Sequence, residues 1–439
     1  MNNSRLLTGL LFATLAGGGL CAQGQSASVV TLDELFTVAE TNSTQLRPSF
    51  TALAEAEKEI KVAENGRLPE ISASLNFSYI GDGFTTKRDL SDYQRAPIPH
   101  FGSGAGVNVT QPLYTGGAVT SSIRMAELKS SAARYAADFK RDNIRFQLTG
   151  YYLDLYKYMN LRKVVENNIS QARKVLDEMN ARYEQGTALR NDITRYELLV
   201  SNLELQLIKI GNVIDILNHN LVITAGLPEK TVVIPDSTIL SRSLPTDSET
   251  WWQEEARTNA PAIRLAESGR EISRVAESLA KADKLPKIGL QAAWTLDGPI
   301  LVEIPPINRN LSYWYVGVGV SYNLSSLYKT NRSIAKSRTA TRKATEELNA
   351  TIENVELAVR SDYIRYLEAY EELKTQMKSV ELAERNYSTT STRYSSDMAL
   401  ITDMLDAANS KLDAEQQLVN ARINIIYYYY KLLFTSGKI

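Results

Sequence analysis

Residues 314–324 read Trp-Tyr-Val-Gly-Val-Gly-Val-Ser-Tyr-Asn-Leu, an alternation that guides the interpretation of the whole chain. Every even-numbered position from Trp314 to Leu324 is apolar, and glycine or polar residues fill the odd positions after Tyr315. A period of two predicts a β-strand with one apolar face and one small or polar face. A strand of this length also matches a tilted crossing of a lipid bilayer, which takes about 9–11 residues.

Three further segments repeat the pattern, clearly in 71–79 and 288–296 and more weakly in 105–113. We therefore predict four strands, at about 69–79, 104–113, 287–296 and 313–324. A soluble sheet with one face on a core would show the same alternation. The strand lengths and the aromatic residues near the strand ends favour a membrane barrel instead. The segments 80–103 and 297–312 are then extracellular loops.

The number of strands requires an oligomer. The smallest membrane barrels have about eight strands, so four cannot close a barrel alone. An open sheet edge in lipid would leave backbone groups without hydrogen-bond partners. The chain must therefore share its barrel, with eight strands from two copies or twelve from three.

The chain contains an internal duplication of one sequence unit. Collinear matches, at offsets that drift from 217 to 211 residues, include Thr41-Asn42 with Thr258-Asn259, Arg182-Tyr183 with Arg393-Tyr394, and Gly226 with Gly437. The predicted organisation is a signal peptide at 1–22, a first unit at 23–227, a linker at 228–250 and a second unit at 251–439. The linker is rich in proline and contains a predicted short strand at Thr231–Ile234. Each unit begins with a helix, at about 32–65 and 248–283, followed by two strands and a long helical hairpin.

The helical hairpins are too long for a globular domain. No proline occurs between Gly117 and Tyr183, which corresponds to about 100 Å of helix at 1.5 Å per residue. The second unit repeats this at about 325–394, and the predicted hairpin tips lie at 184–189 and 395–400. The returning segment at 190–226 carries a coiled-coil seam with spacings of three and four, formed by Ile193, Tyr196, Val200, Leu203, Leu207, Ile210, Ile214, Leu217 and Leu221. The fold class is therefore mainly α with a small β part. Tyr427 to Tyr430 on the last helix are expected to pack between helices, and stacking against a drug molecule is the alternative.

Composition excludes several functions. Lys and Arg number 49 against 50 Asp and Glu, a balance that gives no support for nucleic-acid binding. One Cys and two His exclude disulfide frameworks and clustered metal sites, and no nucleophile with a base is recognisable. We expect no enzyme, no cofactor and no metal site.

The first 22 residues have the pattern of a cleaved signal peptide. Arg5 supplies the charge, Leu6 to Leu20 is apolar, and we expect cleavage after Ala22. Acylation of Cys21, as in a lipoprotein, is the alternative. Either route exports the chain.

These features together resemble the TolC-like outer-membrane efflux family, over essentially the whole mature chain. The resemblance rests on the duplication, on Gln111-Pro112-Leu113-Tyr114-Thr115-Gly116-Gly117 between strand and long helix, and on the hairpin sequences 182–189 and 401–407. It implies a homotrimer with a shared 12-stranded transmembrane barrel in outer-membrane lipid, continued by a periplasmic α-helical barrel. It also implies a periplasmic adaptor, an inner-membrane pump of the RND or ABC type, and passive conduction of small molecules or secreted protein.

The resemblance assigns two functional regions. The first is an adaptor-docking tip, formed by Gly186, Thr187, Ala188, Leu189, Met398, Ala399 and Leu400. Asp397 stands where the first unit has Gly186, and these residues can equally serve only to turn the chain.

The second region is an aperture formed by Asp403 and Asp406, which lie on one helical face at i, i+3. Three copies would place six carboxylates around a narrow axis, where they would attract cations and set a gate. A solvated surface without a gating role is the alternative. Some relatives carry a basic residue near the position of Ala399 that locks the closed tip. This chain lacks it, so the resemblance does not say which contacts would close the tip.

A second class of function remains, an outer-membrane structural or adhesive protein with a coiled-coil stalk. It explains the export signal and the helices but not the duplicated pairs of strands. The sequence does not identify the cargo, which the partner pump selects.

Overall fold

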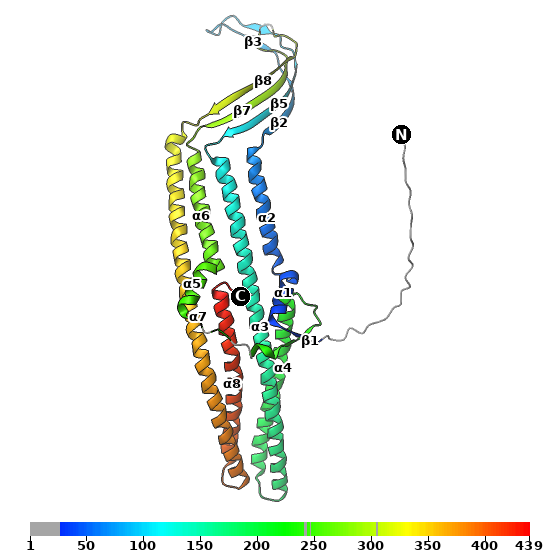
Figure 1. Ribbon diagram of the computed structural model, residues 1–439. Helices are drawn as coiled ribbons and strands as arrows, with labels where there is room; N and C mark the ends of the chain where they lie inside the picture. The colour runs from blue at the N-terminus through cyan, green and yellow to red at the C-terminus, as the bar shows by residue number, and fades with distance from the viewer. Residues whose placement is uncertain (1–26, 241–243, 246, 304–305) are drawn as a thin grey trace, which may run out of the picture.

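The computed structural model describes residues 27–240, 244–245, 247–303 and 306–439. The predicted signal peptide, its cleavage site and Cys21 lie outside these residues. The chain is elongated, with a curved sheet at one end, two helical hairpin tips at the other, and short elements beside the middle (Figure 1). The prediction of a mainly α fold with a small β part is confirmed.

The sheet contains four antiparallel strands in the order β2-β5-β7-β8. Their bounds are Glu70–Tyr79, Phe101–Tyr114, Lys287–Gly298 and Leu311–Ser321. The last strand therefore lies earlier than the predicted 313–324. It ends before Asn323, whose side chain instead accepts hydrogen bonds from the backbone and hydroxyl of Ser325, at 3.1 and 2.8 Å, just before the next helix. The predicted loop at 80–103 is also wrong in part, because it contains a short hairpin of β3 (Gly83–Thr85) and β4 (Gln94–Ala96).

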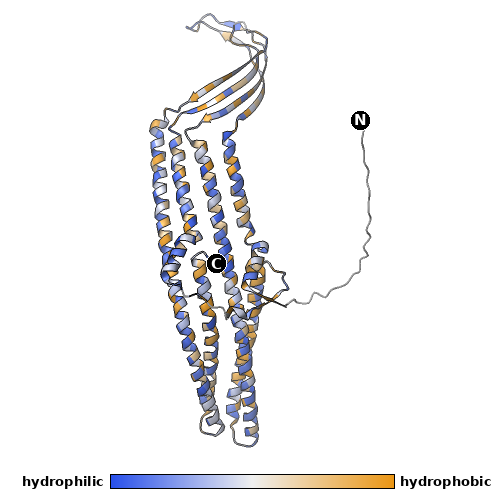
Figure 2. Ribbon diagram, viewed as in Figure 1, coloured by the Kyte–Doolittle hydropathy of each residue, from blue (hydrophilic) through white to orange (hydrophobic). Residues whose placement is uncertain are grey.

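The register of the sheet aligns the apolar positions of all four strands. One row across the sheet contains Ile71, Val109, Ala292 and Val316, and the next contains Ala73, Val107, Trp294 and Trp314. Directly paired residues lie on the same side of a sheet, so these rows form one apolar face. The opposite face carries small and polar rows such as Ser72, Asn108, Ala293 and Tyr315. Figure 2 shows the resulting alternation of hydropathy along the strands.

Two long helices run from the sheet to the tips, α3 (Ala118–Glu184) and α7 (Ser326–Ser395). Two shorter helices return from the tips to the middle of the molecule, α4 (Arg190–Ala225) and α8 (Ile401–Thr435). Together they form two antiparallel hairpins, α3 with α4 and α7 with α8 (Figure 1). All nine seam positions predicted on α4 contribute to the apolar clusters, and Ile193, Tyr196 and Leu221 are at most 1% exposed.

The first helix of each unit is divided, contrary to the prediction of single helices at 32–65 and 248–283. The first unit has α1 (Leu32–Asn42) and α2 (Arg47–Glu64), and the second has α5 (Glu249–Asn259) and α6 (Pro261–Ala282). Pro48 and Pro261 occupy the first turns of α2 and α6. Proline lacks an N–H, so it is tolerated in the first turn of a helix but not in its interior, and a continuous helix through either position is disfavoured.

Residues that recur between the two units touch each other within each unit. Gly226 and Gly437 end α4 and α8 with left-handed φ angles of 72° and 74°. A Cβ at either glycine would lie 2.7 Å from the carbonyl oxygen of Asn42 or 2.5 Å from that of Asn259. The close approach of these backbones explains why the glycine and its partner region recur together.

One buried tyrosine on α3 and one on α7 anchor the segments that precede α1 and α5. The Tyr152 hydroxyl donates to the carbonyl of Val30 at 3.0 Å and accepts from the amide of Asp236 at 2.7 Å. The Tyr366 hydroxyl donates to the carbonyl of Pro245 at 3.1 Å. Val30 ends β1 (Ala27–Val30), which pairs in parallel with β6 (Val232–Pro235), one residue later than the strand predicted in the linker.

Candidate functional site at the helical tips

The first tip is a closed turn that ends α3 and begins α4. The amide of Gly186 donates to the Tyr183 carbonyl and the amide of Thr187 to the Arg182 carbonyl, both at 2.9 Å. This pair of hydrogen bonds is the Schellman motif, which requires a left-handed residue, and Gly186 supplies it at φ 75°.

The second tip has the same backbone although its sequence differs. The amide of Asp397 donates to the Tyr394 carbonyl at 3.0 Å, and the amide of Met398 donates to the Arg393 carbonyl at 2.8 Å. Asp397 takes the left-handed position at φ 59°, which Asp tolerates better than most side chains. The departure from glycine noted in the sequence therefore does not alter the turn. It adds a carboxylate to it.

Arg182 connects the two tips. Its guanidinium forms an ion pair with the carboxylate of Asp397 and donates to the carbonyl of Tyr394 at 3.4 Å. It also lies 5.8 Å from the centre of the Tyr394 ring, a cation–π distance. A cation at the carboxyl end of α7 is further favoured by the helix dipole. Arg182, which belongs to the first unit, thus places a basic side chain against the turn that precedes Ala399.

The residues predicted to dock an adaptor form two small exposed apolar patches. Leu189, Met398 and Leu400 are 68%, 64% and 70% exposed, whereas Ala188 and Ala399 are partly buried. Leu189 and Leu400 occupy equivalent places, each directly before the returning helix of its hairpin. Gly186 and Thr187 are exposed but bonded within the turn, so they shape the patch.

The two predicted aperture carboxylates lie in the first two turns of α8, and both are exposed. The Asp403 carboxylate accepts a hydrogen bond from the amide of Leu400 at 3.0 Å, so it also caps the helix. Asp406 lies one turn further along the same face. The exposed stripe they begin continues along α8 with polar residues only: Ser410, Asp413 and Gln417. In the first unit the position of Asp406 is occupied by Arg195, so the acidic pair is particular to the second unit.

A partly buried polar cluster joins the two hairpins above the tips. Lys411 on α8 is 7% exposed and donates to the side chain of Gln171 on α3 at 3.2 Å. Asn168, one turn away on α3, donates to the Glu415 carboxylate at 2.8 Å. The Lys411 ammonium also lies 5.0 Å from the centre of the Tyr387 ring. Because the Lys411 side chain is buried, separating the hairpins would leave its charge without this partner.

Two other kinds of feature are absent from the described ranges. No helix there is both long and apolar enough to cross a membrane. Those residues also contain no group of three or more His, Cys, Asp or Glu side chains arranged to hold a metal ion.

Known proteins resemble this chain along nearly its whole length. The sequence profile of the family described as outer membrane efflux protein matches residues 35–218 and 252–427, one stretch in each unit. The outer membrane efflux protein BepC of Brucella suis biovar 1 (strain 1330) is 21% identical over 431 residues, which cover 98% of this chain and 90% of BepC.

Solved structures share the fold at low sequence identity. The outer-membrane channel OprN superposes with a TM-score of 0.78 at 16% identity, covering 93% of this chain and 90% of OprN. The outer membrane protein VceC of Vibrio cholerae gives 0.77 at 15% identity, covering 92% of this chain and 96% of VceC. The CmeC outer membrane channel of Campylobacter jejuni gives 0.75 at 12% identity, covering 98% and 94%.

Proposed function

The chain belongs to the outer membrane efflux protein family, and from that premise we propose that it is the exit duct of a tripartite efflux or type I secretion system. The family consists of outer-membrane channels rather than enzymes. The observation that carries the finer proposal is the continuity of a bilayer-sized apolar sheet with paired helices that end in exposed tips. After removal of the signal peptide 1–22, the sheet would lie in the outer membrane and the helices in the periplasm. Movement through the duct is passive, and the partner pump supplies the energy.

The duct would be a homotrimer. Within the described residues, β2 and β8 each pair along one edge only, with β5 and β7. Joining β8 of one copy to β2 of the next would satisfy both edges, and three copies would give a barrel of twelve strands. Exposed apolar residues on α4, spaced along one side, would be covered in the same assembly: Leu198, Leu205, Ile208 and Ile216.

The tips would dock a periplasmic adaptor, which links the duct to an inner-membrane pump of the RND or ABC type. Leu189, Met398 and Leu400 are the largest exposed apolar groups there, and apolar groups on a small turn suit contact with another protein. Because both hairpins present a similar patch, a trimer would offer six docking positions.

The aperture would lie at Asp403 and Asp406. Three copies bring six carboxylates together at the narrow end of the helical barrel, where they attract cations. Since Asp403 caps α8 through Leu400, the same group would hold its helix end in place and line the opening.

Single-channel conductance in planar bilayers tests the duct and its aperture together. The wild type is expected to give small, cation-selective currents that divalent cations block. The double variant Asp403→Ala/Asp406→Ala should give larger and less selective currents. Asp177→Ala, at an exposed site on α3 away from the stripe, is the control and should behave as the wild type.

The outcomes separate the two parts of the proposal. Currents that the double variant leaves unchanged would keep the duct but overturn the aperture assignment. A folded trimer without conductance in either form would overturn the duct and favour a structural or adhesive stalk.

A further inference from the structure

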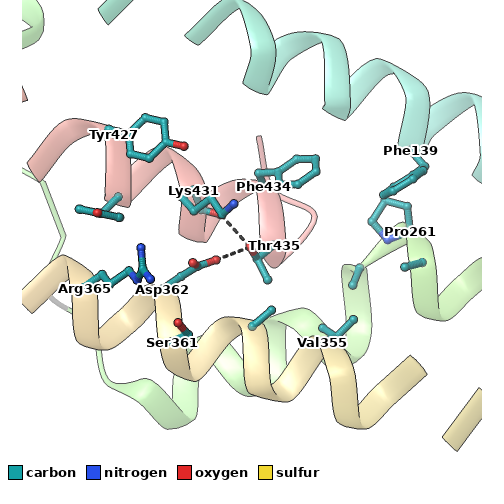
Figure 3. A pocket seen from close by; sticks show the side chains of 14 residues that line it. Phe139, Pro261, Val355, Ser361, Asp362, Arg365, Tyr427, Lys431, Phe434 and Thr435 are labelled. Carbon is teal, nitrogen blue, oxygen red and sulfur yellow. Dashed lines mark hydrogen bonds between the residues drawn. The ribbon is translucent and has the colours of Figure 1, made fainter. Parts of the chain in front are cut away.

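A cavity of about 660 Å³ lies where α8 ends and α6 begins, with α3 and α7 on its two sides (Figure 3). Its size falls in the range of small-molecule sites, which is about 300–1,000 Å³. It is far from the tips and shares no residue with the docking patches or the aperture.

The cavity explains how the four consecutive tyrosines of α8 are used. Tyr427 and Tyr428 line it, whereas Tyr429 and Tyr430 line a groove on another side of α8, beside Asp33 of α1. The last turns of α8 therefore present different aromatic faces to the two sides. All four also pack against the apolar clusters between the helices, as expected from the sequence.

The walls of the cavity are aromatic. Phe139 of α3 and Phe434 of α8 lie on it together with Tyr427 (Figure 3). Behind them Phe146 stacks on Phe434 with ring centres 4.9 Å apart, and its ring is 5.6 Å from that of Tyr427. These contacts fix the orientation of the wall before any ligand arrives, which favours a flat apolar ligand.

Three charged side chains line the cavity: Asp362, Arg365 and Lys431. Asp362 is 7% exposed, and its carboxylate accepts a hydrogen bond from the Thr435 hydroxyl at 2.7 Å. Figure 3 shows the Asp362 carboxylate and Thr435 facing each other. Arg365 and Lys431 are both attracted to the Asp362 carboxylate, and the Lys431 ammonium lies 5.2 Å from the Phe146 ring centre. Two cations against one buried carboxylate leave the cavity with one excess positive charge.

We propose that this cavity is a binding site for a small aromatic anion, such as an aromatic carboxylate or sulfonate. The rings of Phe139, Tyr427 and Phe434 would hold the apolar body, and Lys431 with Arg365 would pair with the anionic group. The proposal does not depend on conduction, because the site is formed within one chain.

Equilibrium dialysis of 2-naphthoate against the protein in nanodiscs tests the site, with empty nanodiscs as the blank. Its cationic counterpart of similar shape, 2-naphthylmethylammonium, tests the sign of the charge. We expect naphthoate to bind at least tenfold more tightly than this amine. Lys431→Met should weaken naphthoate binding about tenfold, the usual effect of losing one charged contact. Asp362→Asn should strengthen it, because it removes the opposing negative charge.

Two variants separate binding in the cavity from general adsorption. Ala358→Trp places a large side chain at an exposed lining position, so it should fill the cavity and abolish binding without disturbing the core. Lys336→Met makes the same charge change as Lys431→Met, but at an exposed site on α7 that does not line the cavity, and it should leave binding unchanged.

The proposal would be overturned by equal uptake in empty nanodiscs, by undiminished binding in Ala358→Trp, or by tighter binding of the amine. None of these results bears on the duct, which the conductance measurement addresses separately.

Discussion

The guanidinium of Arg182, in the last turn of α3, pairs with the carboxylate of Asp397, which lies just beyond the end of α7. The two residues belong to different units and are 215 positions apart in the chain. They join the two hairpin tips at the place where an adaptor would act. Opening of the tip would have to break this pair or move both hairpins together.

The tip pair is expected to control local opening more than overall stability. Asp397→Gly preserves the left-handed turn but removes the carboxylate, and Arg182→Gln removes the charge from the other side. Because Asp397 is largely exposed, each change should lower the free energy of unfolding by no more than about 1 kcal/mol. Amide hydrogen exchange at Met398 should nevertheless become several-fold faster, since the turn is no longer tied to α3.

The double variant tests whether these two residues act together. If they do, Arg182→Gln/Asp397→Gly should exchange little faster than either single variant, because the second change removes nothing further. If the increases in exchange rate of the two single variants instead multiplied in the double variant, the pairing would be contradicted. Arg190→Gln, at an exposed and weakly paired arginine on α4, provides the matched loss of charge and should leave the exchange at Met398 unchanged.

The buried hydroxyl of Tyr152 is expected to hold the β1–β6 pair against α3. Tyr152→Phe leaves the Val30 carbonyl and the Asp236 amide without this partner, a loss of about 1–3 kcal/mol. Hydrogen exchange of the β6 amide of Val233 should therefore rise about tenfold or more.

Tyr366→Phe is the matched control for this prediction, because Tyr366 lies in the second unit and its hydroxyl contacts Pro245, just before α5. It should leave exchange at Val233 unchanged and loosen the segment before α5. Equal effects of the two variants at Val233 would show that the tyrosines act through overall stability rather than as local anchors.

Sequence periodicity predicted the long helices and the four strands because each has a repeating apolar face. It missed the division at Pro48 and Pro261, where proline signals were present but were outweighed by the continuing helical pattern. It missed β3 and β4 because strands of three residues have no measurable period. The partners of Arg182 and the lining of the cavity come from distant helices, so only the packed structure brings them together.

Asp362 is expected to make the stability of the protein depend on pH. The free energy of unfolding should fall as the pH rises above the usual pKa of an aspartate. Burial raises the pKa of this carboxyl, while the Thr435 hydroxyl and the charges of Lys431 and Arg365 act in the opposite direction. Between the unfolded pKa, about 3.9, and the raised folded pKa, the native state binds more protons than the unfolded state, so stability decreases with rising pH. Asp362→Asn removes this dependence and keeps an acceptor for Thr435.

Thermal unfolding at a series of pH values measures the effect. The midpoint of Asp362→Asn should exceed that of the wild type at pH 7, and the difference should shrink as the pH falls to about 4. Asp177→Asn, at an exposed position, should show no such trend. A wild type that gains stability relative to Asp362→Asn as pH rises would contradict the sign of the shift.

The two faces of the sheet are expected to respond oppositely to charge. Val316 lies at the middle of β8 in the apolar row with Ala292, whereas Gln291 lies on the other face, paired with Gly317. If the apolar face meets lipid, Val316→Arg should cost about 2–4 kcal/mol and reduce the amount of trimer recovered from outer-membrane fractions. Gln291 is the neighbour of Ala292 on β7, so Gln291→Arg places the same charge at nearly the same height of the sheet but on the face towards the interior. It should assemble normally and shift the selectivity of the channel towards anions.

Normal assembly of Val316→Arg together with failure of Gln291→Arg would contradict this assignment. It would mean that the polar face of the sheet meets lipid and the apolar face is covered by protein.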